Sequence, residues 1–249
     1  MSLNLLASLF KKKHISADLS FIVADIHSHL IPGIDDGAKN MEDAIQMIQG
    51  LYDLGIKKIY TTPHIMGDTY RNTSEIINEG LLDVNNVLKE KKISPPIHAT
   101  SEYYFDENFF KLIEKKDLLT FGDNYLLFEL PHFNRPANIE EIVFQLNLAG
   151  YKPILAHPER YPYLYDAKLS QYEKLKNIGL CFQVNLLSFI GGYTADAKFF
   201  ANKLAELKMI NFIATDLHNQ AQLNFIKNKL SQKIVDKIIT NNLLNEQLL

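Results

Sequence analysis

The chain has 249 residues, of which 47% are hydrophobic, and a formal net charge of −3. This length suits one α/β barrel with a large core. Only three of the 26 Lys and Arg residues are arginine. The negative net charge provides no overall basic field for nucleic acid, so an anionic partner must be recognised by a local site. The single cysteine, Cys181, excludes an internal disulfide and fits a reducing, cytoplasmic location.

Residues 1–20 are predicted to form an N-terminal arm ahead of one barrel domain that spans residues 21–249. The first ten residues, MSLNLLASLF, are apolar but too short to cross a bilayer, and Lys11 to Lys13 follow this stretch, which is the wrong order for a signal peptide. We therefore expect no transmembrane segment. A helical or frayed arm is the simple interpretation, and attachment to a membrane or partner is the alternative.

Seven short apolar runs predict strands that are buried on both faces. Helix-length stretches with 3.6-residue spacing separate them, and strict alternation of this kind predicts right-handed parallel connections and a closed or nearly closed barrel. An open doubly wound sheet is the alternative, but no Gly-rich phosphate loop follows the first strand. The expected strands are residues 21–24, 58–61, 97–100, 125–128, 153–156, 180–184 and 211–214.

The helices are expected to begin and end at recognisable signals. Asn40 is a predicted N-cap, and Gly55 is the predicted residue after the end of the same helix. Two further helices are expected to close the barrel at the C-terminal end, over residues 222–230 and 233–248. The other expected helices are residues 41–54, 74–89, 107–116, 139–148, 170–177 and 195–207.

Six of the seven apolar runs end in His, Asp or Glu, in ADIHSH, TTPH, TSE, LFEL, LAHPER and IATDLH. In a parallel barrel these residues share one rim, where imidazoles and carboxylates can bind metal. Alternate residues of an extended segment point the same way, so Asp25 is expected to converge with the two histidines of DIHSH. The predicted metal ligands are His27, His29, His64, Glu102, Glu129, His157, Asp216 and His218.

The number of candidate ligands predicts more than one metal ion. Four or five ligands satisfy one ion, so eight or nine indicate two or three ions that share bridging carboxylates and water. Five histidines with three or four carboxylates leave such a site net positive. A dianionic phosphomonoester is then a natural substrate.

The three arginines, Arg71, Arg135 and Arg160, each lie just after a predicted strand, where a planar guanidinium can grip phosphate. Arg160 is the strongest candidate, and Arg71 and Arg135 have the alternative of pairing with surface acids. Asp36 either belongs to a turn at a helix entry or orients a ligand or a water molecule. His132 either reaches the pocket or has no metal role.

Taken together, these motifs resemble those of the PHP superfamily. Within it, they resemble the bacterial metal-dependent protein-tyrosine phosphatases of the CpsB/CapC type from capsule and exopolysaccharide operons. The motifs DIHSHLIPGIDDG, TTPH, TSEYY, FEL, AHPERY and TDLHN follow that pattern in order, from Asp25 to Asn219. The resemblance implies a distorted (β/α)7 TIM-like barrel with three metal ions, commonly manganese, with Fe, Zn or Mg as alternatives. It also implies that the eight residues above are the ligands and that Arg160 binds phosphate.

The resemblance further implies a substrate and a cellular setting. The substrate would be phosphotyrosine in the tail of a bacterial tyrosine kinase that controls polysaccharide synthesis, with the enzyme in the cytoplasm or held at the inner membrane through that kinase. One departure matters: relatives often place an arginine shortly after the DxH of the last strand, whereas HNQAQLNF has none. Arg71 or Arg135 would replace it, or substrate preference differs.

The predicted mechanism is in-line attack on phosphorus by a metal-bridging hydroxide. Cysteine-based phosphatase chemistry is excluded, since Leu187 stands where the loop arginine of that mechanism is required. The main alternative is a small-molecule phosphatase, such as a histidinol phosphatase, which would share the metal ligands. An amidohydrolase-type metal hydrolase and a non-catalytic metal-binding module are weaker alternatives.

Overall fold

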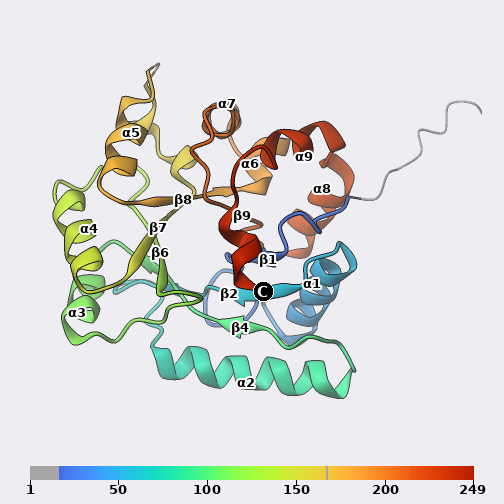
Figure 1. The fold of residues 1–249 in the computed structure, drawn as a ribbon. Helices are drawn as coiled ribbons and strands as arrows, with labels where there is room; N and C mark the ends of the chain where they lie inside the picture. Colours follow the sequence, from blue (N-terminus) through green and yellow to red (C-terminus); the bar gives the residue numbers. More distant parts are fainter. Residues whose placement is uncertain (1–16, 167) are drawn as a thin grey trace, which may run out of the picture.

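Parallel strands form the middle of the molecule (Figure 1). The computed structural model describes residues 17–166 and 168–249. Neighbouring strands pair in the orders β1-β2-β4 and β3-β5-β6-β7-β8-β9, and every pairing is parallel. The strands are β1 (Ala24–Asp25), β2 (Lys58–Thr61), β3 (His64–Ile65), β4 (His98–Ala99), β5 (Glu102–Tyr104), β6 (Tyr125–Glu129), β7 (Lys152–Ala156), β8 (Cys181–Asn185) and β9 (Phe212–Ala214).

Two of the expected strands, residues 58–61 and 97–100, are each followed after a short break by a second short strand that was not predicted. β2 and β3 are separated by Thr62 and Pro63, and β4 and β5 by Thr100 and Ser101. Pro63 has no N–H to donate to the ladder, but its carbonyl accepts hydrogen bonds from the Glu102 N–H and the Ser101 hydroxyl. β2 pairs with β4 and β3 with β5, so the nine pieces correspond to seven successive parallel strands. The predicted α/β class is confirmed.

Backbone contacts connect the first and last strands of this series. Beyond the end of β1, Ser28 forms a parallel bridge with Leu217, which follows β9. The His29 N–H donates to the Leu217 carbonyl at 2.9 Å, and the Asp216 N–H donates to the His27 carbonyl at 2.8 Å. These bonds bring the loops after β1 and β9 together at the carboxyl ends of their strands.

Most strand residues are buried on both faces, as expected, and the two faces belong to different parts of the core. The strand β4 differs, because His98 is exposed and Ala99 is half-buried. Along β6, Tyr125 and Leu127 pack with Ile154 and Phe212 in a cluster contributed by the strands, whereas Phe128 packs in the larger cluster beneath the helices. Side chains in a strand point alternately to opposite faces. One face of the strand therefore packs against side chains of the other strands, and the opposite face packs against the helices.

The helices lie outside the strands (Figure 1). The Asn40 side chain accepts a hydrogen bond from the Asp43 N–H, and Gly55 follows the same helix with φ of +100°, so both predicted signals are confirmed. No helix in the described ranges is both long and apolar enough to cross a membrane. The helices are α1 (Met41–Asp53), α2 (Ser74–Glu90), α3 (Glu107–Lys115), α4 (Ile139–Leu148), α5 (Ser170–Asn177), α6 (Leu186–Ile190), α7 (Ala195–Glu206), α8 (Gln220–Lys229) and α9 (Gln232–Ile238).

The C-terminal tail differs from the prediction. The helix expected over residues 233–248 ends at Ile238, and a short 3₁₀ helix, Leu244–Leu248, follows. Within it, the buried Asn245 amide donates to the carbonyls of Ala24 and Ile213 and accepts from the Ile213 N–H. These tertiary bonds bind the tail to β1 and β9, which a continuous helical pattern does not reveal.

The predicted N-terminal arm lies mostly outside the described residues. Its last four residues, 17–20, are described, and two of them, Ala17 and Leu19, are buried in the core. The Leu19 N–H donates to the Leu54 carbonyl at the end of α1. This part of the chain therefore packs against the strand and helix layers.

Candidate metal centre

The side chains of the centre project from the carboxyl ends of the strands. Along β6 the inward residues Tyr125 and Leu127 are followed at the same spacing by Glu129, the last residue of the strand. Phe212 and Ala214 of β9 are followed in the same way by Asp216, whose φ is +50°. Glu129 and Asp216 are both buried, at 7% and 2% exposure. Strand periodicity therefore directs Glu129 to the inside of the rim, and Asp216 reaches the same place from a left-handed residue just beyond the end of β9.

The two histidines after β1 face carboxylates from two other strands. His27 Nε2 lies 3.1 Å from Glu102 Oε2 and 3.2 Å from Asp216 Oδ1. His29 Nε2 lies 3.6 Å from each of the same two oxygens. Both imidazoles are fully buried. Glu102 and Asp216 thus stand between the two rings.

Glu102 also connects these histidines to the next two along the rim. His64 Nδ1 lies 3.1 Å from Glu102 Oε2 and 3.3 Å from Glu129 Oε1. His157 Nε2 lies 3.1 Å from Glu102 Oε1 and 3.9 Å from Glu129 Oε2. A single buried carboxylate therefore contacts four imidazoles, which is the arrangement expected of a bridging ligand.

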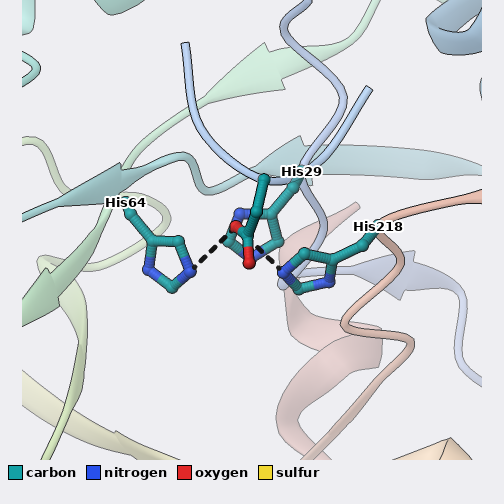
Figure 2. A group of neighbouring side chains, drawn as sticks. His29, His64 and His218 are labelled. Atoms are coloured by element: carbon teal, nitrogen blue, oxygen red, sulfur yellow. Dashed lines mark ion pairs between the residues drawn. The ribbon is translucent and has the colours of Figure 1, made fainter. Parts of the chain in front are cut away.

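Asp36 joins the centre at its outer side. Its Oδ1 lies 3.5 Å from Nε2 of His64 and 3.5 Å from Nε2 of His218, and these two ion pairs are the dashed lines in Figure 2. Figure 2 also shows that the rings of His29, His64 and His218 point toward one another, and the His29 and His218 rings stack at 3.9 Å. Asp36 thus lies with the candidate ligands rather than only in a turn.

The structure brings all eight predicted ligands together with Asp36. They form four overlapping groups in which each residue offers one ligand atom and these atoms lie within 4.8 Å of one another. The overlap fits a centre in which neighbouring ions share ligands. The groups are His29 with Asp36, His64 and His218; His27 with His29 and Asp216; His27 with Glu102 and His157; and His64 with Glu102 and Glu129.

The donor atoms of the centre fit metal ions better than they fit hydrogen bonds to one another. Within the described ranges, the buried nitrogens His27 Nε2, His29 Nε2 and His64 Nδ1 have no hydrogen-bond partner. Buried polar atoms are nearly always satisfied, so orphans that face carboxylates need an explanation. Neutral imidazole nitrogen and carboxylate oxygen are ligands of Zn, Mn and Fe, and a shared cation would satisfy both.

Partners outside the centre orient the rings. His27 Nδ1 is 2.8 Å from Gln183 Oε1, and His29 Nδ1 is 2.8 Å from Asp35 Oδ2. His218 Nδ1 is 2.9 Å from the Asp216 carbonyl. An Nδ1–H that donates to oxygen leaves the Nε2 lone pair toward the centre, as metal-ligating histidines require. Neither Gln183 nor Asp35 was selected as a site residue from the sequence.

Burial and neighbouring charge act in opposite directions on the two glutamates. Burial disfavours ionised Glu102, but the imidazoles of His27 and His64 outweigh it and hold the Glu102 pKa well below its usual range. Burial raises the Glu129 pKa well above its usual range, and the nearby Glu102 carboxylate raises it further. Added positive charge, such as that of a bound metal ion, would favour the ionised form of Glu129.

Asp25 does not join the ligands, contrary to the prediction from strand alternation. Its carboxylate accepts hydrogen bonds from the Thr215 N–H at 2.8 Å and the Thr215 hydroxyl at 2.7 Å. Burial raises the Asp25 pKa to about 6. Asp25 thus holds β1 to β9 beneath the centre, because β1 ends at Asp25 and the regular alternation stops there.

The structure brings one of the three arginines to the centre. Arg160 lines the cavity, and its Nη1 donates to Asp216 Oδ2 at 3.2 Å. Burial and then the Arg160 charge lower the His157 pKa to about 3, so this imidazole is neutral, as a metal ligand must be. Arg71 is exposed and donates to the Gly67 carbonyl, and Arg135 pairs with Glu140 at 2.8 Å. Neither lines the cavity.

A cavity of about 440 Å³ opens over the centre. His132 lines it, which supports the pocket interpretation of this residue, and Tyr70 stacks on the His64 ring. Tyr193, which sequence reasoning did not select, also lines it, and no local pattern marks that residue. The lining residues are Asp36, His64, Met66, Tyr70, Glu102, Glu129, His132, His157, Arg160, Tyr193, Asp216, His218, Asn219 and Gln222.

Two sequence relatives are similar to most of this chain. The tyrosine-protein phosphatase YwqE of Bacillus subtilis (strain 168) is 31% identical over 202 residues, which cover 81% of this chain and 79% of that protein. The tyrosine-protein phosphatase CpsB of Streptococcus pneumoniae is 27% identical over 206 residues, which cover 78% of this chain and 82% of that protein.

A solved structure shares the fold and most of the chain length. It comes from work on YwqE of Bacillus subtilis and CpsB of Streptococcus pneumoniae, described as metal-dependent tyrosine phosphatases, and it matches with a TM-score of 0.78 and 30% identity over 90% of both chains. The family model described as capsular polysaccharide synthesis, CpsB/CapC, matches residues 23–246. The chain therefore belongs to the CpsB/CapC family.

Proposed function

We propose that this protein is a metal-dependent protein-tyrosine phosphatase. The observation that carries the proposal is the convergence of nine imidazole and carboxylate side chains beneath a cavity lined by Arg160. Three buried imidazole nitrogens of this group lack a hydrogen-bond partner. The names of the relatives and the description of the matching structure support the same reaction.

The proposed ligands are the eight residues predicted from the sequence, and Asp36 either binds metal or orients a ligand or a water molecule. The donor set of imidazoles and carboxylates suits manganese, which we propose as the metal, with Fe, Zn and Mg as the alternatives. The overlap of the four groups of ligands supports more than one ion, and we propose three. Bound divalent ions would lower the pKa of a shared water molecule and neutralise phosphoryl charge.

Arg160 has the clearest role among the other residues of the cavity. Its guanidinium stands beside the centre with one N–H donated to Asp216 and further N–H groups available to phosphoryl oxygens. Phenolate, the leaving group from phosphotyrosine, has a parent pKa of about 10 and needs little help from a general acid. The chain therefore has to bind and orient the phosphoryl group rather than form a covalent intermediate with it.

We further propose that the substrate is phosphotyrosine in the tail of a bacterial tyrosine kinase that regulates capsule or exopolysaccharide synthesis. The family to which the chain belongs supports this setting. A cytoplasmic enzyme, recruited to the inner membrane through the kinase, would meet that tail. Arg71 and Arg135 are proposed only as contacts for the protein substrate, since neither lines the cavity.

The deciding experiment is hydrolysis by the metal-stripped protein, before and after addition of Mn, Fe, Zn or Mg. A phosphotyrosyl peptide and histidinol phosphate are compared side by side. We expect no activity without metal, recovery with manganese, and higher kcat/KM on the peptide. Activity that survives complete metal removal would exclude the metal mechanism, and a preference for histidinol phosphate would make this protein a small-molecule phosphatase.

A further inference from the structure

Tyr193 lies between two cavities at the edge of the metal centre. It belongs to the loop that joins α6 to α7 and is one of three residues, with His132 and Arg160, that line both the cavity over the centre and a second cavity of about 330 Å³. Its ring and its hydroxyl contact different groups. The two ends of this side chain therefore have separable consequences.

The ring of Tyr193 supports Arg160. The guanidinium carbon of Arg160 lies 4.4 Å from the ring centroid, which is a cation–π contact, and Arg160 Nη1 donates to Asp216 Oδ2 at 3.2 Å. The guanidinium is thus held by an aromatic face and by one carboxylate oxygen. A planar group restrained in these two ways presents its other N–H donors in a defined direction.

The hydroxyl of Tyr193 supports Asp216. It donates to Asp216 Oδ2 at 3.1 Å, and Asn185 Nδ2 donates to the same oxygen at 2.6 Å and to the Tyr193 hydroxyl at 3.2 Å. The other oxygen, Oδ1, lies 3.2 Å from His27 Nε2 within the centre. Donors outside the centre therefore hold one oxygen of Asp216 while its partner faces the ligand cluster.

We propose that Tyr193 is a positioning residue with two separable roles: its ring orients Arg160 for the phosphoryl group, and its hydroxyl orients Asp216 for metal. The Arg160 role rests on the proposed function, whereas the Asp216 role rests only on the centre being a metal site. Partners of this kind typically change metal affinity about 10- to 100-fold when they are removed.

The test compares wild type with Tyr193→Phe, which removes only the hydroxyl, and Tyr193→Leu, which removes the ring as well. Manganese affinity is measured by chelator competition, and inorganic phosphate is titrated calorimetrically into protein saturated with manganese. Tyr193→Phe should weaken manganese about tenfold and leave the phosphate dissociation constant near wild type. Tyr193→Leu should weaken manganese similarly and phosphate about tenfold as well.

Two outcomes would overturn the proposal: phosphate binding by Tyr193→Leu that equals wild type, or equal loss of phosphate binding in Tyr193→Phe and Tyr193→Leu. Thermal melts check that each variant is folded, and Tyr193→Met replaces Tyr193→Leu if the latter is not. Because neither titration needs turnover, a wild type that binds phosphate but hydrolyses no phosphotyrosine would refute the proposed function and leave the Asp216 role standing.

Discussion

At the scale of single residues, the metal centre contains two kinds of side chain: candidate ligands, and partners that orient those ligands. The candidate ligands could be selected from the sequence because His, Asp and Glu are rare at the ends of buried apolar runs. Their orienting partners could not. Gln183, for example, is 156 residues from His27, the ring that it contacts, and nothing in its own neighbourhood marks it. Only folding brings these two residues together.

The role of the centre predicts opposite outcomes for two single substitutions. Asp216→Ala removes a buried carboxylate from the ligand cluster, so phosphotyrosyl peptide hydrolysis should fall by at least about a hundredfold. Cys181→Ser should retain close to wild-type activity, because Cys181 begins β8 at the end of the strand opposite the centre. Steady-state kinetics with saturating manganese measure both. The reverse pattern would contradict a metal mechanism and indicate a cysteine nucleophile.

At the scale of elements, the corner between β8 and α6 shows how a tertiary contact builds local structure. α6 was not predicted because LLSFI is a short apolar run without a polar face. Glu159, from the 3₁₀ turn after β7, is fully buried and accepts hydrogen bonds from the Asn185 N–H at 3.0 Å and the Ser188 hydroxyl at 2.6 Å. A carboxylate from another loop therefore satisfies donors at the first turn of α6.

The same contacts predict the cost of removing Glu159. Glu159→Ala leaves a buried N–H and a buried hydroxyl without their acceptor, so the free energy of unfolding should fall by about 2 to 3 kcal/mol. Glu159→Gln keeps an acceptor oxygen and should cost about 1 kcal/mol or less. Urea unfolding curves of the two variants give these values. Equal losses would mean that charge, rather than the acceptor, stabilises the corner.

At the scale of the whole molecule, both ends of the described chain pack beneath the strands, opposite the centre. The Asn245 amide joins β1 to the C-terminal 3₁₀ helix, and the Lys58 amine donates to the Leu248 carbonyl. On the N-terminal side, Leu19 is buried beside the end of α1. The folded unit therefore includes residues that the sequence assigned to the arm.

A substitution at Leu19 tests this boundary. Leu19 is fully buried in the core, so Leu19→Ala should lower the free energy of unfolding by about 2 to 5 kcal/mol. Leu82→Ala is the matched control, because Leu82 is 61% exposed on α2 and its loss should cost about 0.5 kcal/mol or less. Urea unfolding measures both. A Leu19→Ala variant as stable as the control would place residues 17–20 outside the cooperative unit.

The sequence by itself determined the α/β class, the alternation of the main strands and helices, and the eight residues that meet at one rim. These follow from local signals, since apolar periodicity, caps and the chemistry of strand ends are properties of short segments. The tertiary structure alone decided that Asp25 binds Thr215, that Arg160 rather than Arg71 or Arg135 lines the cavity, and that Tyr193 stands beside it. Those outcomes depend on contacts between residues far apart in the chain, which no local pattern contains.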